Sequence, residues 1–249
     1  TLISLVLSDV IGDPLDVIAS GPTTPDPTTF KHALDVLGKF DLIKSVPNGI
    51  LRYLREGEAG TRPETPKPGD PVFRKTFNLF VGTNRLALDT CKEKAIELKL
   101  NPYIIDDKLQ GDVSDVAEFI MKTSLKYKDD NNVMKPACLL FGGEPTVKTS
   151  GKGIGGRNQH LALLCGTKLQ SQPGITILSA GTDGTDGPTD AAGAVVDSET
   201  IPDALSKNID PEKYFTEFDS YHFFEKAGGH IVTGPTMTNV MDIIVVIVE

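Results

Sequence analysis

The segment ACLLFGGEPTVKTSGKGIGGRNQHLALLCGTKLQSQPGITILSAGTDGTDGPTD (residues 137–190) decides the fold of this 249-residue chain. It holds an apolar run at Ala137–Phe141, a helical pattern over 157–169 and a second apolar run at Ile175–Ala180. Short apolar runs bounded by turn residues are typical of buried strands. A strand, a helix and a second strand in series predict a layered α/β architecture.

The same alternation continues on both sides of this segment. Asn84 and Asp112 are placed as N-caps, because short polar side chains there accept a hydrogen bond from the first turn. Further strands are expected at Phe77–Val81, Tyr103–Ile105, Ala194–Val196, His230–Thr233 and Ile243–Val248, and further helices at Phe30–Phe40, Ile50–Leu54, Asn84 to about Leu100, after Asp112, and Tyr221–Ala227. The pattern predicts layered α/β/α packing around parallel or mixed sheets.

The opening run Thr1–Leu7 is apolar and predicts a parallel strand buried on both faces. Such a strand needs a neighbour delivered by a crossover, so we expect the chain to start inside a domain. Residues 57–71 are polar, with four prolines and three glycines, which is typical of a domain boundary. We therefore expect a domain boundary near residue 70.

The composition argues against some classes of binding partner. The net charge of −9 argues against nonspecific nucleic-acid binding, because no basic stretch is present to neutralise phosphates. The apolar stretch Ile243–Val248 is too short to span a bilayer, so no membrane partner is expected. The cysteines stand in apolar contexts and are interpreted as reduced core residues. The histidines lack metal-ligand spacing, and His32 and His160 are interpreted as exposed helix positions.

A glycine-rich loop, Gly151–Gly156, leads directly into the helix that starts at Arg157. Unpaired N–H groups at a helix N-terminus favour an anion, and an arginine adds a planar fork for phosphate or carboxylate. The loop also matches G-x-G-x-x-G, but residues 141–148 before it resemble a hairpin, which weakens a dinucleotide interpretation. No Walker A loop occurs, so a kinase here would not be of the P-loop type.

Carboxylates follow two predicted strands. Asp183, Asp186 and Asp190 lie in the loop after Ile175–Ala180, and Glu144 follows Ala137–Phe141. Loops at the carboxyl ends of strands are where α/β sheets bind ligands. The aspartates could hold Mg²⁺ or accept the proton of an attacking hydroxyl; turn capping is the alternative for each of them.

Several of these segments recur together in one known family. The matching stretches are SDVIGDPLDVIASGPTTPDPTTF (8–30), ETPKPGDP (64–71), GTNRLAL (82–88), GGRNQHLAL (155–163), AGTDGTDGPTDAAGAVVD (180–197) and TGPTMTNVMDI (233–243). In these stretches the chain resembles the C-terminal portion of a glycerate kinase of the MOFRL-containing family, which has also carried the name hydroxypyruvate reductase. The resemblance runs over nearly the whole chain in family order.

The resemblance implies transfer of the γ-phosphate of ATP to D-glycerate with Mg²⁺, giving 2-phosphoglycerate in a cleft between two lobes. It implies that residues 1–70 are the C-terminal remainder of an N-terminal Rossmann-like lobe that is largely missing, and that residues 71–249 are the MOFRL-containing C-terminal α/β domain. It implies D-glycerate and ATP as small-molecule partners. The oligomeric state, with a homodimer as one option, and the choice between a cytoplasmic and a mitochondrial location stay open. An essential lysine of the family has no position in this chain, so we expect the chain alone to be an incomplete enzyme.

The residues expected to carry this chemistry fall into four groups. They are Arg157, Asp183, Asp186 and Asp190 for catalysis; Gly142, Gly143, Glu144, Gly153, Gly155, Gly156, Thr182 and Gly184 for the cofactor ATP; Asp9, Ser20, Gly21, Asn84, Asn158, Thr236 and Asn239 for the substrate; and Asp183 and Asp186 for metal.

The chain departs from the family pattern TGPTGTNVND at Met237 and Met241, although Asn239 is kept. Two other functions stay open. An NAD(P)-dependent hydroxypyruvate reductase would use residues 151–156 to hold a pyrophosphate. A noncatalytic ligand-binding or oligomerisation module would use none of these groups for chemistry.

Overall fold

The computed structural model describes residues 1–149 and 151–249, which form two compact units. The first unit comprises Thr1–Val6 and Pro14–Val81, and the second comprises Leu7–Asp13 and Gly82–Glu249. The first unit extends beyond the polar segment to Val81, so most of the strand at 76–82 belongs to it. The expected domains, residues 1–70 and 71–249, stay a prediction.

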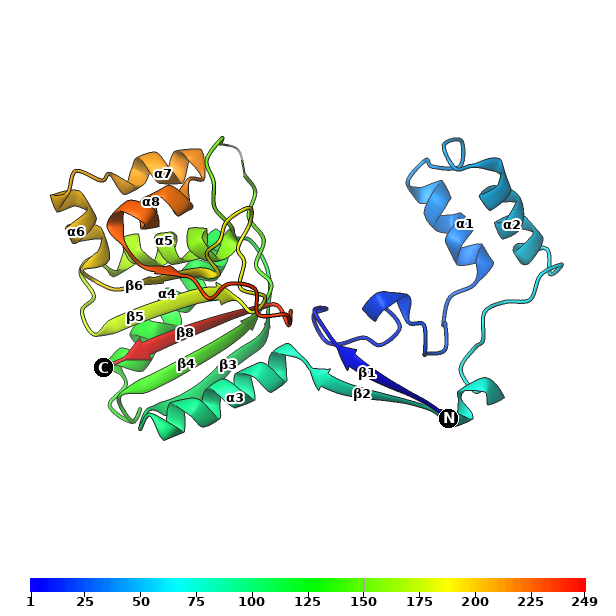
Figure 1. The fold of residues 1–249 in the computed structure, drawn as a ribbon, viewed down its shortest axis with the longest axis horizontal. Helices are drawn as coiled ribbons and strands as arrows, with labels where there is room; N and C mark the ends of the chain where they lie inside the picture. Colours follow the sequence, from blue (N-terminus) through cyan, green and yellow to red (C-terminus); the bar gives the residue numbers. More distant parts are fainter. Residues whose placement is uncertain (150) are drawn as a thin grey trace. The chain divides into compact units, whose positions relative to one another are not determined.

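The first unit combines a two-stranded sheet with a helical hairpin (Figure 1). Thr29 and His32 form a capping box at the start of the first helix. Phe30 packs on Gly57 of the second helix, where a β-carbon would lie 2.2 Å from the phenyl ring. The elements are β1 (Leu2–Leu7), η1 (Ile18–Ser20), α1 (Phe30–Lys39), α2 (Asn48–Glu58), η2 (Pro71–Lys75) and β2 (Thr76–Gly82).

The expectation of a fully buried first strand is wrong. In β1 the side chains of Ile3 and Leu5 are 61% and 67% exposed. In β2 the side chains of Phe77 and Val81 are 54% and 56% exposed. The apolar sequences do form strands, but a sheet of only two strands cannot enclose either of them between neighbours.

The second unit is built on a six-stranded sheet in the order β3-β4-β8-β5-β6-β7. The pair β3–β4 is parallel and the other pairs are antiparallel, which confirms the predicted mixed sheet. The strands are β3 (Asn101–Leu109), β4 (Ala137–Gly143), β5 (Ile175–Gly181), β6 (Gly193–Val196), β7 (His230–Ile231) and β8 (Asp242–Val248).

Helices cover both faces of this sheet, so the unit is a three-layer α/β/α structure (Figure 1). Alternate residues of β4 enter different cores, because successive side chains in a strand point to opposite faces. Leu139 and Phe141 join the larger core, whereas Cys138 and Leu140 pack with Leu88 of α3. The helices are α3 (Asn84–Glu97), α4 (Val113–Asp129), α5 (Arg157–Leu169), α6 (Thr200–Ser206), α7 (Pro211–Glu217) and α8 (Ser220–Ala227).

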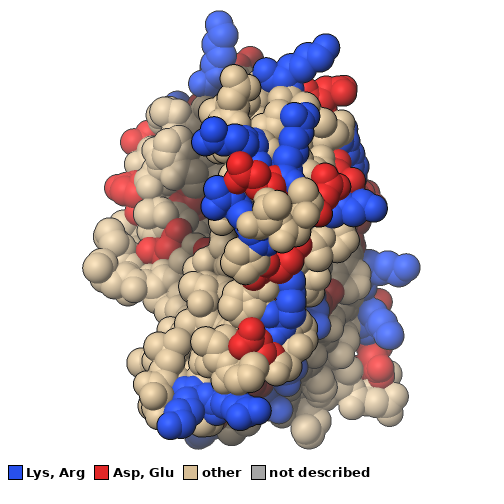
Figure 2. Space-filling view, turned by 90° about the vertical axis from the view of Figure 1, so that its right-hand side faces the viewer, with Lys and Arg blue, Asp and Glu red and all other residues tan. Residues whose placement is uncertain are grey.

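The apolar segment at 243–248 is confirmed as a strand, and β8 lies inside the sheet between β4 and β5. Among the residues that the structure describes, no helix is both long enough and apolar enough to cross a membrane. On the face of the protein drawn in Figure 2, basic and acidic side chains are interspersed.

Three local predictions need correction. The N-cap of α3 is Thr83, whose side chain accepts from the N–H of Leu86, and Asn84 is the first helical residue. Residues 141–148 do not form a hairpin, because β4 pairs with β3 and β8 on its two sides. His32 is exposed as predicted. His160 is buried, because α7 ends over it and the ring of Phe218 stacks on the imidazole at 4.7 Å between centroids.

The buried imidazole of His160 predicts acid sensitivity. Burial lowers its pKa below the ordinary value of 6.5. As the pH falls, His160 is protonated in the unfolded chain before it is protonated in the folded protein. The free energy of unfolding should therefore fall as the pH drops from about 7 to about 5. His160→Phe keeps an aromatic ring against Phe218 and should reduce this pH dependence, measured as the urea midpoint at each pH. An unchanged dependence would contradict this assignment.

Candidate functional site

A cavity of about 810 Å³ lies at the edge of the second unit's sheet where β3, β4 and β5 end and β8 begins. This edge is where α/β sheets place ligands, because the connecting loops leave room beyond the strand ends. Six predicted site residues line the cavity: Glu144, Gly155, Gly156, Arg157, Asp183 and Asp186. The structure therefore brings together residues that are up to 42 positions apart in the sequence.

Arg157 is held by two carboxylates. Its Nε donates to Oδ2 of Asp242 at 2.6 Å and its Nη2 donates to Oδ1 of Asp242 at 3.1 Å, a bidentate arrangement. Its Nη1 donates to Oε1 of Glu144 at 2.8 Å. The side chain of Asp242 is 1% exposed, whereas that of Glu144 is 42% exposed. Asp242 thus fixes the arginine from inside, and Glu144 is the partner on the solvent side.

The charges at this pair follow from burial. Desolvation alone would lower the pKa of Arg157, but the two carboxylates raise it overall, so the guanidinium stays charged. Burial raises the pKa of Asp242, and the hydrogen bonds and charge of Arg157 oppose this rise. A buried carboxylate of this kind is retained because its partner cation is close and well aligned.

Asp186 caps helix α5. Its Oδ1 accepts from the N–H of Asn158 at 3.0 Å, and its Oδ2 accepts from the N–H of Gln159 at 2.8 Å. The side chains of Asn158 and Gln159 donate to the same carboxylate. The prediction that these N–H groups are free for a bound anion is therefore wrong, because Asp186 takes that place. Burial raises the pKa of Asp186, opposed by these hydrogen bonds.

The glycines of the loop make room for protein atoms. A β-carbon at Gly151 or Gly153 would lie 2.2 Å from the carbonyl oxygen of Glu217 or 2.4 Å from Cβ of Asp219, respectively. At Gly155 it would lie 2.2 Å from Oγ of Ser220. The G-x-G pattern is thus explained by packing against the end of α7 and the start of α8.

Gly156 serves a different contact. A β-carbon there would lie 2.3 Å from the carboxylate of Asp186, so glycine is required for the cap to reach α5. None of these glycine contacts depends on a dinucleotide, and the loop therefore gives no support to the reductase alternative.

The loop after β5 is tied to the loop before β8. Thr182 Oγ1 donates to the carbonyl of Met241 at 2.7 Å and accepts from the N–H of Val240 at 2.8 Å. Thr236 Oγ1 donates to the carbonyl of Thr182 at 2.6 Å, and the Thr236 N–H donates to the carbonyl of Asp183. These contacts hold the backbone that carries Asp183 at the cavity.

Four other predicted residues belong to the same two loops or to α5. Gly184 packs against the carbonyl of Gly234, and Asn239 accepts from the N–H of Met241. Asn158 is buried, and its Oδ1 accepts from the hydroxyl of Ser179 at 2.6 Å. Asp190 does not line the cavity, and its Oδ1 accepts from the hydroxyl of Tyr221 at 2.9 Å.

The remaining predicted residues lie away from the cavity wall. Gly142 and Gly143 are buried in β4, and Asn84 packs on Gly142 while donating to the carbonyls of Val240 and Asp242. Asp9 is exposed. Ser20 and Gly21 belong to the first unit, at the end of η1, where both have left-handed backbone angles.

Sequence reasoning missed Asp242. The sequence does contain a signal for this residue, because Asp242 is the first residue of a strand that is otherwise apolar, DIIVVIV. A charge at the end of a buried strand needs a partner, and the nearest arginine at another element's start is the natural candidate.

Asp186 and Asp190 allow a matched test of the cap. Asp186→Ala should lower the free energy of unfolding by about 2–4 kcal/mol, because it leaves buried N–H groups without acceptors. Asp190→Ala, in the same loop but exposed, should cost less than about 0.5 kcal/mol. Chemical denaturation followed by circular dichroism measures both. Equal effects would contradict the capping role.

Comparison with known proteins gives two family matches along the chain. The MOFRL family matches residues 137–242, and a domain of unknown function, DUF4147, matches residues 1–55. The chain is 42% identical to a D-glycerate 2-kinase of Thermotoga maritima over 98% of its own length and 56% of the relative's. It is 34% identical to a glycerate kinase of Macaca fascicularis over 97% of its own length and 70% of the relative's.

A crystal structure of glycerate kinase from Thermotoga maritima superposes with a TM-score of 0.89 at 40% identity, covering 99% of this chain and 57% of that one. The chain thus spans little more than half the length of several relatives that it matches. Sequence identity, fold and the order of the matching segments agree, and the chain belongs to the glycerate kinase family that carries a MOFRL domain.

Proposed function

We propose that the protein transfers the γ-phosphate of ATP to D-glycerate, giving 2-phosphoglycerate. The observation that carries the proposal is the cavity at the strand ends, where the Arg157 fork lies with Glu144 and Asp183. Relatives that match nearly the whole chain are named D-glycerate 2-kinase and glycerate 2-kinase, which supports the substrate and the product.

Both proposed substrates are anions, and the cavity offers one fixed positive charge for them. Arg157 is the one cationic side chain among the described residues that line it. Asp242 already holds Nε and Nη2, so the exposed side of the guanidinium, now facing Glu144, is the part that meets a phosphate or the glycerate carboxylate. Phosphoryl transfer depends mainly on such positioning and charge neutralisation.

The carboxylates of the cavity divide into two kinds. Asp186 uses both oxygens for the α5 cap, so we assign it a supporting role and not metal binding. Asp183 accepts through Oδ1 from the N–H of Thr185, which leaves Oδ2 for a cation or for a substrate hydroxyl proton. Glu144 is the second exposed carboxylate.

These two residues fit a magnesium ion better than a transition metal. The described residues contain no group of three or more His, Cys, Asp or Glu side chains arranged for a metal. Mg²⁺ is commonly bound by one or two carboxylates together with substrate phosphates, and Asp183 and Glu144 would supply them. Bound there, the ion would neutralise charge on the phosphate oxygens.

The proposal is tested with the protein expressed from its complete reading frame. ADP formation is measured with ATP, Mg²⁺ and D-glycerate, and L-glycerate serves as the matched control. The product is identified by its conversion with enolase alone, which dehydrates 2-phosphoglycerate but leaves 3-phosphoglycerate unchanged. A folded protein that forms no ADP with D-glycerate would overturn the proposal.

Arg157→Lys tests the fork. The variant keeps a positive charge but loses the planar, bidentate geometry, so kcat/KM for D-glycerate should fall by about 10²–10³-fold. Arg85→Lys on the exposed side of α3 is the matched control and should leave kcat/KM unchanged. The urea midpoint of each variant shows whether it is folded. Wild-type activity in folded Arg157→Lys would contradict the assignment.

A further inference from the structure

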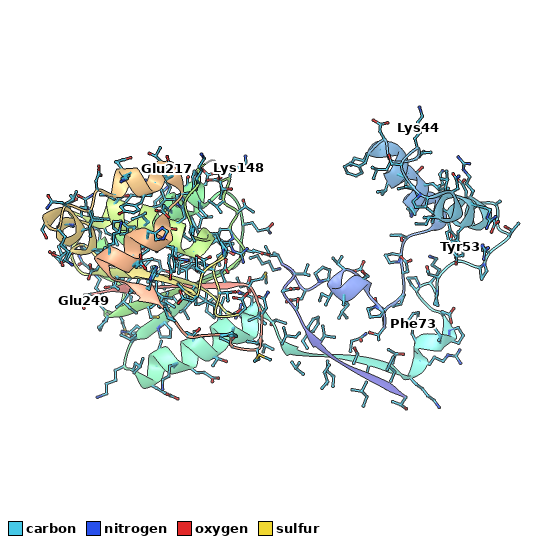
Figure 3. All side chains as sticks on the ribbon, turned by 45° about the horizontal axis from the view of Figure 1, so that its top comes forward. Lys44, Tyr53, Phe73, Lys148, Glu217 and Glu249 are labelled. Atoms are coloured by element: carbon cyan, nitrogen blue, oxygen red, sulfur yellow. The ribbon has the colours of Figure 1, made fainter. Side chains whose placement is uncertain are left out.

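The turn between α7 and α8, residues 217–221, runs alongside the glycine-rich loop that leads to Arg157. Figure 3 labels Glu217 at the end of α7, next to the loop that continues from Lys148. The Gly153 N–H donates to the carbonyl of Glu217 at 2.8 Å, and the Tyr221 N–H donates to the carbonyl of Ile154 at 3.0 Å. Each segment therefore donates one backbone hydrogen bond to the other.

Between these two backbone bonds lies one short side-chain bond. Oδ1 of Asp219 accepts from the N–H of Ile154 at 2.9 Å. The same oxygen lies 2.6 Å from Nδ1 of His222, which fixes the rotamer of the carboxylate. Ile154 immediately precedes Gly155. Gly155, Gly156 and Arg157 follow one another along the wall of the cavity.

The turn is itself anchored on α5. Phe218 adopts a left-handed backbone angle, φ 56°, and its ring stacks on His160 at 4.7 Å with 16° between the planes. Phe215 also contacts the imidazole, edge to face, at 5.8 Å between ring centroids. His160 lies one helical turn beyond Arg157 on α5. The segment between α7 and α8 therefore packs on the same helix that carries the arginine.

We propose that Asp219 is a positioning residue for the glycine-rich loop: it holds Ile154 and thereby sets the path of Gly155 and Gly156 at the cavity. The glycines at 151, 153 and 155 make this possible, since any side chain there would push the loop off the turn. The inference rests on the proposed function for its kinetic part, because the cavity is taken to bind ATP and D-glycerate.

The expected kinetic effect separates positioning from chemistry. Asp219 does not line the cavity, so its loss should leave the reacting groups in place once ligand is bound. A loop that must be ordered on binding weakens binding, so KM should rise while kcat changes little. The loss of one hydrogen bond to a charged acceptor corresponds to a rise of about tenfold.

The experiment compares three variants. Asp219→Ala removes the acceptor, and Asp219→Asn keeps an oxygen that can accept from Ile154. Glu225→Ala is the matched control: it removes an exposed carboxylate from the adjoining helix α8, and this side chain forms no hydrogen bond or ion pair with the described residues of the loop. Amide hydrogen exchange of residues 152–156 is measured without ligand, and KM and kcat for ATP and D-glycerate are measured in the ADP assay.

Asp219→Ala should speed exchange in residues 152–156 and raise KM about tenfold at similar kcat. Asp219→Asn should restore most of both, and Glu225→Ala should resemble the wild type. Unchanged exchange in Asp219→Ala, or faster exchange with unchanged KM, would overturn the proposal. If the wild type forms no ADP, the proposed function fails separately, and the exchange measurement still decides whether Asp219 holds the loop.

Discussion

The ion pair between Arg157 and Asp242 joins the first residue of α5 to the first residue of β8. Asp242 is buried where β8 begins, and burying its charge without a cation would cost free energy. Without Asp242, the side chain of Arg157 would be free to change its position. Asp186 fixes the same helix turn from the other side through backbone N–H groups. The cavity wall is therefore rigid where it carries its positive charge.

The glycine-rich loop gains its shape from protein contacts. Its glycines admit the α7–α8 turn on one side and the Asp186 carboxylate on the other, so the sequence motif reports close packing between segments distant in sequence. This differs from a loop whose glycines face a bound phosphate. It also explains how a chain without a Walker A loop can present an ordered backbone beside Arg157.

Apolar periodicity was enough to predict the strands of the second unit and the full span of α5. Glu144 and Asp183 were singled out because they follow strands and Arg157 because it begins a helix, but only the structure shows that all three line one cavity. The cap formed by Asp186 could not be predicted from the sequence, because the path of the loop determines which carboxylate meets which N–H. The burial of His160 was missed because α7 is too short to stand out. Met237 and Met241 have φ of 62° and 70°, a conformation that the family pattern's glycine and asparagine adopt at lower cost.

The position of β8 sets an order for assembly of the protein. β8 is the last strand in the sequence, yet it separates β4 from β5 in the sheet. During synthesis those two strands emerge with exposed edges that cannot pair as they do in the native protein. Contacts of this long sequence separation form slowly, so the second unit should complete its sheet later than a fold with locally paired strands.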